Sequence, residues 1–209
     1  MISTMCKLQT QLPILLLVLI VPAVVNAAEL SVEVQDSAGK KLTDAVVYLE
    51  NSKTAGKVSD TTIDVEQKGR QFNPLVSVVQ AGASINFPNR DKVRHHVYSF
   101  SPAKKFELKL YSGVPTKPVL FDKPGTVVLG CNIHDNMLAF IHIVETPYFA
   151  KTNASGVATF SQILEDSYEL KVWHYALQTE NKPAQQAITI KAGNQPVVIQ
   201  LEINNAKRL

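Results

Sequence analysis

The stretch from Gly125 to Met137 reads GTVVLGCNIHDNM. The β-branched and apolar residues before Cys131 predict a β-strand. The motif C-x2-H-x2-M follows, and it brings a thiol, an imidazole and a thioether (Cys131, His134 and Met137) into seven residues. Such a strand and loop predict a metal site built on soft donors.

A second imidazole is expected from the upstream segment 87–100, which reads FPNRDKVRHHVYSF. Neighbouring residues in a strand point to opposite faces, so only one of His95 and His96 is expected to face the site. Two imidazoles, one thiolate and a weak axial thioether are the ligands of a type 1 (blue) copper site. Because soft and borderline donors suit both Cu(I) and Cu(II), this ligand set indicates one-electron chemistry.

The segment from about Asp64 to Glu145 resembles the cupredoxins, and most of all the plastocyanin and amicyanin group. The resemblance rests on FPN at 87–89, on RHHVYSF at 94–100, on PGTVVLGC at 124–131 and on the length of the loop 131–137. It implies a Greek-key β-sandwich and one copper ion bound by His95, Cys131, His134 and Met137. The family's ligand lies two residues before a valine, here Val97, which favours His95 over His96.

The family resemblance also implies roles around the ligands. His134 would lie in a surface patch as the electron exit, and Asn89 and Thr126 would hold the ligand loops by hydrogen bonds. This sequence departs from the family at the loop proline, which is Ile133 here. It also has Asp135 and Asn136 after the second histidine, and His96 where the family has an asparagine that ties the ligand loops together. A carboxylate at Asp135 is expected to stabilise Cu(II).

Outside this segment the chain also has the pattern of an all-β protein, with no helix expected. Alternating apolar residues between turn signals predict short strands. The expected strands are 29–34, 45–49, 76–79, 84–87, 95–100, 106–110, 127–131, 138–144, 157–160, 168–173, 187–190 and 197–203. Closely spaced strands of this kind indicate β-sandwiches.

A second sandwich is suggested by three separated motifs. GKKLTDAVVYL at 39–49 resembles the opening of carboxypeptidase-regulatory-like domains, whose continuation resembles TNASGVATF at 152–160 and YELKV at 168–172. The order predicts an interrupted domain, residues 28–57 and 146–203, with the cupredoxin domain 58–145 inserted and a tail at 204–209. The alternative is an N-terminal hairpin that extends the inserted sheet.

Residues 1–27 have the composition of a secretory signal peptide. Lys7 precedes an apolar run from Leu12 to Val25, and small residues end at Ala27. A membrane anchor is disfavoured because the run is short and contains prolines. Cleavage predicts a periplasmic or secreted protein without a membrane span, in which Cys131 and Met137 are the remaining cysteine and methionine. A lone thiol in an oxidising compartment must be buried or bound to a metal.

Composition excludes several classes of protein. With 45% hydrophobic residues and a net charge of +3, the chain is neither disordered nor a nucleic-acid-binding protein, and two cysteines exclude a disulfide scaffold. Trp173 is expected in the core, His142 as a packed or rim side chain, and His174 at a strand edge or over the copper. Five lysines form either a solvated face or a patch that steers an acidic partner: Lys104, Lys105, Lys109, Lys117 and Lys123.

The expected function is that of an exported blue copper protein that carries single electrons between redox partners and is not an enzyme. The chain resembles exported proteins described as methylamine utilization protein-like, which implies a dehydrogenase or a cytochrome as partner. A copper oxidase or reductase would need a second copper, for which only His96, His142 and His174 remain. Two alternatives stay open, a protein that binds and delivers copper and a structural sandwich with a vestigial site.

Overall fold

The computed structural model describes residues 28–56, 58–134, 136–178, 182–204 and 206. The predicted signal peptide, residues 1–27, lies outside the described residues. In the described ranges all the elements are strands, which confirms the all-β prediction. They are β1 (Ala28–Asp36), β2 (Val46–Glu50), β3 (Thr62–Asp64), β4 (Glu66–Gln67), β5 (Phe72–Asn73), β6 (Val76–Gln80), β7 (Ala83–Asn86), β8 (His95–Ser99), β9 (Phe106–Tyr111), β10 (Val119–Phe121), β11 (Gly125–Cys131), β12 (Leu138–Val144), β13 (Phe149–Lys151), β14 (Val157–Ile163), β15 (Asp166–Trp173), β16 (Ala184–Ile190) and β17 (Asn194–Leu201).

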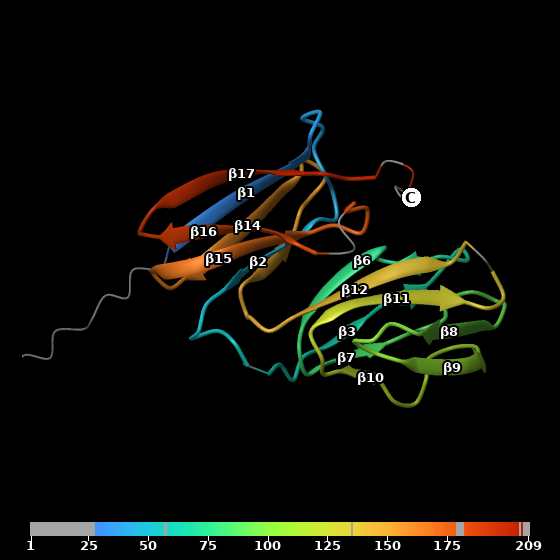
Figure 1. The fold of residues 1–209 in the computed structure, drawn as a ribbon. Helices are drawn as coiled ribbons and strands as arrows, with labels where there is room; N and C mark the ends of the chain where they lie inside the picture. Colours follow the sequence, from blue (N-terminus) through green and yellow to red (C-terminus); the bar gives the residue numbers. More distant parts are fainter. Residues whose placement is uncertain (1–27, 57, 135, 179–181, 205, 207–209) are drawn as a thin grey trace, which may run out of the picture.

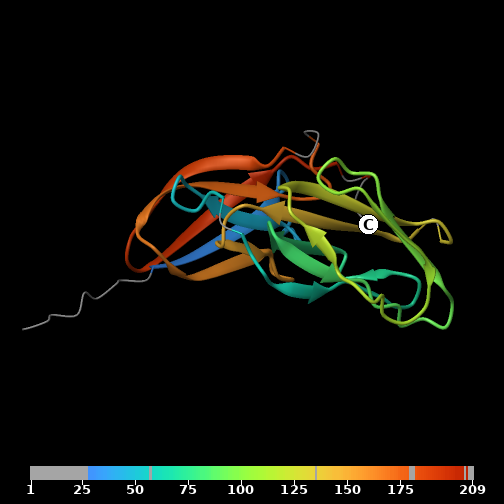
Figure 2. The ribbon, with the colours of Figure 1, turned by 90° about the horizontal axis from the view of Figure 1, so that it is seen from below.

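The strands form two sandwiches that lie side by side along the long axis of the molecule (Figures 1 and 2). The outer sandwich packs the sheet β14-β1-β17 against the sheet β13-β2-β15-β16, so its strands come from both ends of the described chain. The inner sandwich contains the five-stranded sheet β6-β12-β11-β8-β9 and the sheet β10-β7-β3, with the small hairpin β4-β5 beside them. No described helix is long and apolar enough to cross a membrane.

Where apolar and polar residues alternate along a strand, its apolar side chains all point to one face and are buried in one of two cores. In β1 the apolar side chains of Leu30, Val32 and Val34 are buried while the residues between them are partly exposed. They join the outer core, in which Trp173 is fully buried as predicted. The inner core collects apolar side chains from both sheets of that sandwich, and it also contains Cys131 and Met137.

Strand β12 is buried on both faces and joins the two sandwiches. Ala139, Ile141 and Ile143 point into the inner core, whereas Phe140, His142 and Val144 face the outer sandwich. The Phe140 ring stacks on Tyr175 at a centroid distance of 5.1 Å, and the His142 ring stacks on Trp173 at 4.7 Å. His142 is therefore a packed side chain, as predicted, and apolar side chains of β12 belong to the core of the outer sandwich.

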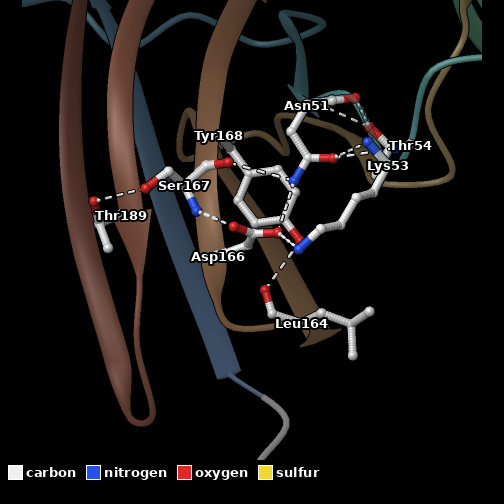
Figure 3. A network of polar contacts seen from close by, with 8 residues as sticks. All are labelled: Asn51, Lys53, Thr54, Leu164, Asp166, Ser167, Tyr168 and Thr189. Atoms are coloured by element: carbon white, nitrogen blue, oxygen red, sulfur yellow. Dashed lines mark hydrogen bonds and ion pairs between the residues drawn. The ribbon is translucent and has the colours of Figure 1, made fainter.

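A polar network fixes the chain where it leaves the outer sandwich after β2 (Figure 3). Asn51 donates from its side-chain amide to Asp166, at 3.3 Å, and the ammonium of Lys53 lies 2.6 Å from the same carboxylate. Thr54 closes the turn by donating to the carbonyl of Asn51. The exposed ion pair contributes little to stability. The network holds residues 51–54, where the chain leaves the outer sandwich, against the start of β15.

Candidate metal centre

Two strands and one loop bring three of the expected ligands together. His95 begins β8, Cys131 ends β11, and His134 lies in the loop that follows. Their donor atoms all lie within 4.8 Å of one another. The Cys131 Sγ is 3.9 Å from His95 Nδ1, and the two imidazole rings are 5.1 Å apart at an angle of 60°.

Strand pairing explains why His95 and Cys131 meet. β11 and β8 are antiparallel, with Cys131 opposite Val97, and His95 shares the side of Val97 because it is two residues away. Gly130 lets the Tyr98 ring lie against the strand beside Cys131, since a Cβ there would lie 2.7 Å from the ring and would displace it. The register therefore places the thiol and the imidazole on the buried side of the sheet and Tyr98 on the other side.

The ligand loop returns to β12 through a tight turn. The Met137 N–H donates to the His134 carbonyl at 3.0 Å, and the Met137 side chain is buried in the same apolar cluster as Cys131. The side chain of the expected fourth ligand thus lies in the core cluster that also contains the thiol. Ile133, which stands where the family has proline, is 50% exposed. Asp135, whose carboxylate is expected to stabilise Cu(II), lies outside the described residues.

The donor atoms suit a soft or borderline metal ion such as copper. Cys131 is a free, buried cysteine, and the His134 Nδ1 is buried without a hydrogen-bond partner. Such an unpaired buried nitrogen is unusual, because it loses its bond to water and gains nothing. An ion about 2.0–2.3 Å from each donor needs donors roughly 3.3–3.8 Å apart, so the 3.9 Å between Cys131 and His95 is close to what is required. The residues therefore fit a copper ion.

The two adjacent histidines differ in burial and in their neighbours. His95 is fully buried and faces Cys131. His96 lies on the opposite side of β8, with its Nε2 2.9 Å from the Glu107 carboxylate and its Nδ1 3.2 Å from the Asn132 amide. Because Asn132 follows Cys131, His96 links β8 to the ligand loop from outside.

Asp91 is part of the site, and the sequence interpretation did not include it. Its carboxylate lies 2.8 Å from His95 Nε2 and accepts hydrogen bonds from the N–H groups of Gly69 and Arg70. Burial would raise the pKa of Asp91, but the hydrogen bonds from Arg70, His95 and Gly69 hold that pKa below its ordinary value. Asp91 is held in place by Gly69 and Arg70, which lie in a different hairpin, so no motif in the sequence around His95 indicates this contact.

The two residues expected to hold the ligand loops differ in outcome. Asn89 is buried, donates to the carbonyls of Val93 and Tyr111, and accepts from the Asp91 N–H, so it fixes the loop before β8. Thr126 does not hold a ligand loop. It lies near the opposite end of β11 from Cys131, where its hydroxyl is 3.1 Å from His142 Nδ1.

The remaining candidates lie away from the donors. His174 is neither an edge residue nor a cap over the copper, because it is buried in the outer sandwich, where its Nε2 is 3.2 Å from the Thr43 carbonyl and its Nδ1 accepts from the Ala176 N–H. Lys104, Lys105 and Lys123 gather beside Asp122, near Gly125. Gly125 is six residues from Cys131 along a strand, about 20 Å at 3.3 Å per residue, so these lysines do not surround the site.

Comparison with known proteins gives structural neighbours only. The sequence matches no family model and no curated protein. Its structural neighbours are cupredoxins and a related copper enzyme. They include a purple cupredoxin from Nitrosopumilus maritimus (17% identity over 41% of this chain and 100% of that one, TM-score 0.34) and the reduced form of an amicyanin mutant (16% identity, 47% and 98%, TM-score 0.37). A copper-containing nitrite reductase from Thermus scotoductus SA-01 matches at 22% identity over 46% of this chain, with a TM-score of 0.37, and this chain spans only 25% of its length.

Proposed function

We propose that this protein is an exported electron carrier that holds one copper ion in a type 1 site. His95, Cys131 and His134 would bind the ion, with Met137 as a weak axial ligand. The observation that carries the proposal is the convergence of one buried thiol and two imidazoles within 4.8 Å. The bound copper would supply the change between Cu(I) and Cu(II).

The protein's own residues contribute rigidity and access. His95 and Cys131 are held by paired strands and shielded from water, so their positions are fixed before an ion arrives. Such a preformed site reduces the rearrangement that accompanies a change of oxidation state. His134 is half-buried and follows the exposed Ile133, so a redox partner would approach here. We propose a dehydrogenase or a cytochrome as that partner and assign the protein no enzymatic step.

The proposal is tested by adding one equivalent of Cu(II) to the metal-free protein that starts at Ala28. We expect an intense visible band that a reductant bleaches and an oxidant restores, and that is absent in Cys131→Ser. A colourless protein that still binds Cu(I) would favour the copper-delivery alternative instead. If the protein binds neither ion, the structural sandwich with a vestigial site would be the remaining alternative.

A matched pair of variants tests the ligand assignment. His95→Ala removes an imidazole that faces Cys131, whereas His96→Ala removes the adjacent one, which faces Glu107. We expect His95→Ala to abolish the visible band and His96→Ala to retain it. The opposite result would show that the other histidine binds the metal.

A further inference from the structure

The ring of His95 is held from both sides. Its Nδ1 faces the Cys131 sulfur at 3.9 Å, and its Nε2 lies 2.8 Å from the Asp91 carboxylate. We propose that Asp91 is a positioning residue whose negative charge, acting through His95, raises the affinity of the site for a divalent ion relative to Cu(I) and lowers the reduction potential of bound copper. The part that concerns copper potential rests on the function proposed above.

The carboxylate of Asp91 occupies an anion-binding turn. The tight turn between β4 and β5 carries Gly69 and Arg70 at φ of 65° and 60°, and their successive N–H groups donate to the two carboxylate oxygens at 2.8 and 2.9 Å. Two N–H groups that converge in this way form a site for a negative charge. Positive φ angles at two successive residues are those of a two-residue hairpin turn, and here the turn leaves both N–H groups directed at Asp91. These two donors favour the ionised form of the carboxylate.

This anchored carboxylate determines which nitrogen of His95 carries the proton. A carboxylate accepts hydrogen bonds, so Nε2 must donate, and a neutral imidazole then leaves Nδ1 with its lone pair directed toward Cys131. His95 is fully buried and cannot turn to solvent for another partner. A carboxylate behind a ligating histidine also increases the electron donation of the ring, and its removal elsewhere costs about 10–100-fold in metal affinity.

The total charge of Cys131 and Asp91 explains why a divalent ion would gain more from Asp91 than Cu(I) would. The Cys131 thiolate and Asp91 together carry two negative charges, which a divalent ion neutralises. A monovalent Cu(I) would leave one net negative charge at a site where His95 and Cys131 are buried, and a buried unbalanced charge is costly. Asparagine at position 91 could keep much of the loop geometry, but it would not supply the charge.

The test compares affinities for Co(II) and Cu(I) in the parent and in Asp91→Asn. Competition with chelators gives both affinities, and Co(II) adds absorption bands that need no redox change. We expect Asp91→Asn to weaken Co(II) binding about 10–100-fold while Cu(I) binding changes less than about threefold. With copper bound, a tenfold loss of Cu(II) affinity relative to Cu(I) affinity would raise the midpoint potential by about 59 mV.

Glu107→Gln is the matched control. It removes the same charge from a carboxylate that contacts His96, on the outer side of the same strand. We expect it to change the ratio of Co(II) to Cu(I) affinity by less than about threefold. Equal losses for the two ions in Asp91→Asn, an unchanged ratio, or an equal change in Glu107→Gln would overturn the proposal.

Two further measurements keep the test decisive if Asp91→Asn does not fold. Asp91→Glu retains the charge and is expected to keep the affinity ratio within about threefold of the parent. Nitrogen NMR of the metal-free parent should find the proton of neutral His95 on Nε2, and a proton on Nδ1 would overturn the proposal. If the parent lacked a thiolate-dependent copper band, the electron-carrier proposal would fail, and the affinity ratio would still test Asp91.

Discussion

Acid should destabilise the protein through the buried imidazole of His142. The ring is enclosed between the two sandwiches, stacked on Trp173 and tilted against Tyr48, and its Nδ1 contacts the Thr126 hydroxyl. Burial disfavours the charged form and lowers the pKa of His142 from 6.5 to about 4. Glu50 lines the same pocket but is paired with Lys171, and the Tyr48 hydroxyl is neutral because burial and the charge of Glu50 raise its pKa.

The sign and the size of this loss of stability follow from the pKa of His142 in the folded and unfolded states. An unfolded chain has the ordinary His pKa of 6.5, so between that value and about 4 the unfolded state binds a proton that the folded state does not. Stability is therefore full above pH 6.5 and falls as the pH decreases. The whole difference corresponds to about 3 kcal/mol, of which about 2 kcal/mol is lost between roughly pH 7 and pH 5.

Urea unfolding of the metal-free protein at about pH 7 and about pH 5 measures this loss. His142→Phe keeps an aromatic ring on Trp173 and cannot titrate. We expect the parent to lose about 2 kcal/mol more than His142→Phe over this range, whatever the stability of the variant at neutral pH. An equal pH dependence in the two proteins would refute the argument, since the other titrating groups are common to both.

Three other predictions concern packing. Gly130→Ala should cost about 1–3 kcal/mol in urea unfolding and shift the visible band, because its Cβ would lie 2.7 Å from the Tyr98 ring beside Cys131. Trp173→Ala should cost about 3–5 kcal/mol in the same assay, since this ring is fully buried; a cost below about 1 kcal/mol would contradict its place in the core. Met137→Leu conserves volume and should cost less than about 1.5 kcal/mol, while loss of the axial thioether should raise the copper potential in voltammetry.

The long strands could be predicted from their apolar residues. β1 alternates buried and more exposed positions, β12 is an almost continuous apolar run, and each predicted strand overlaps an observed one. Five observed strands were not predicted: β3, β4, β5, β10 and β13. Each has only two or three residues, which is too short for a period of two to be recognised.

The candidate ligands were accessible to sequence reasoning because three of them fall in one loop. The choice of His95 over His96 needed only the alternation of side chains along a strand and the family's register against Val97. Asp91 was missed because its role depends on Gly69 and Arg70, which the fold brings to it from another hairpin. Thr126 was expected to hold a ligand loop, although five residues at about 3.3 Å each already separate it from Cys131 along the strand.

Strand β12 gives the outer sandwich a physical role in the metal centre. The strand starts directly after Met137, so any movement of its first residues would move the end of the ligand loop. Its inner side chains pack in the inner core, and on its other face Phe140 and His142 are covered by Tyr175 and Trp173 of the outer sandwich. Without that cover, aromatic and apolar side chains on one whole face of β12 would be exposed to water. The outer sandwich therefore completes the burial of the strand that positions Met137, which connects a domain distant in sequence to the rigidity of the candidate site.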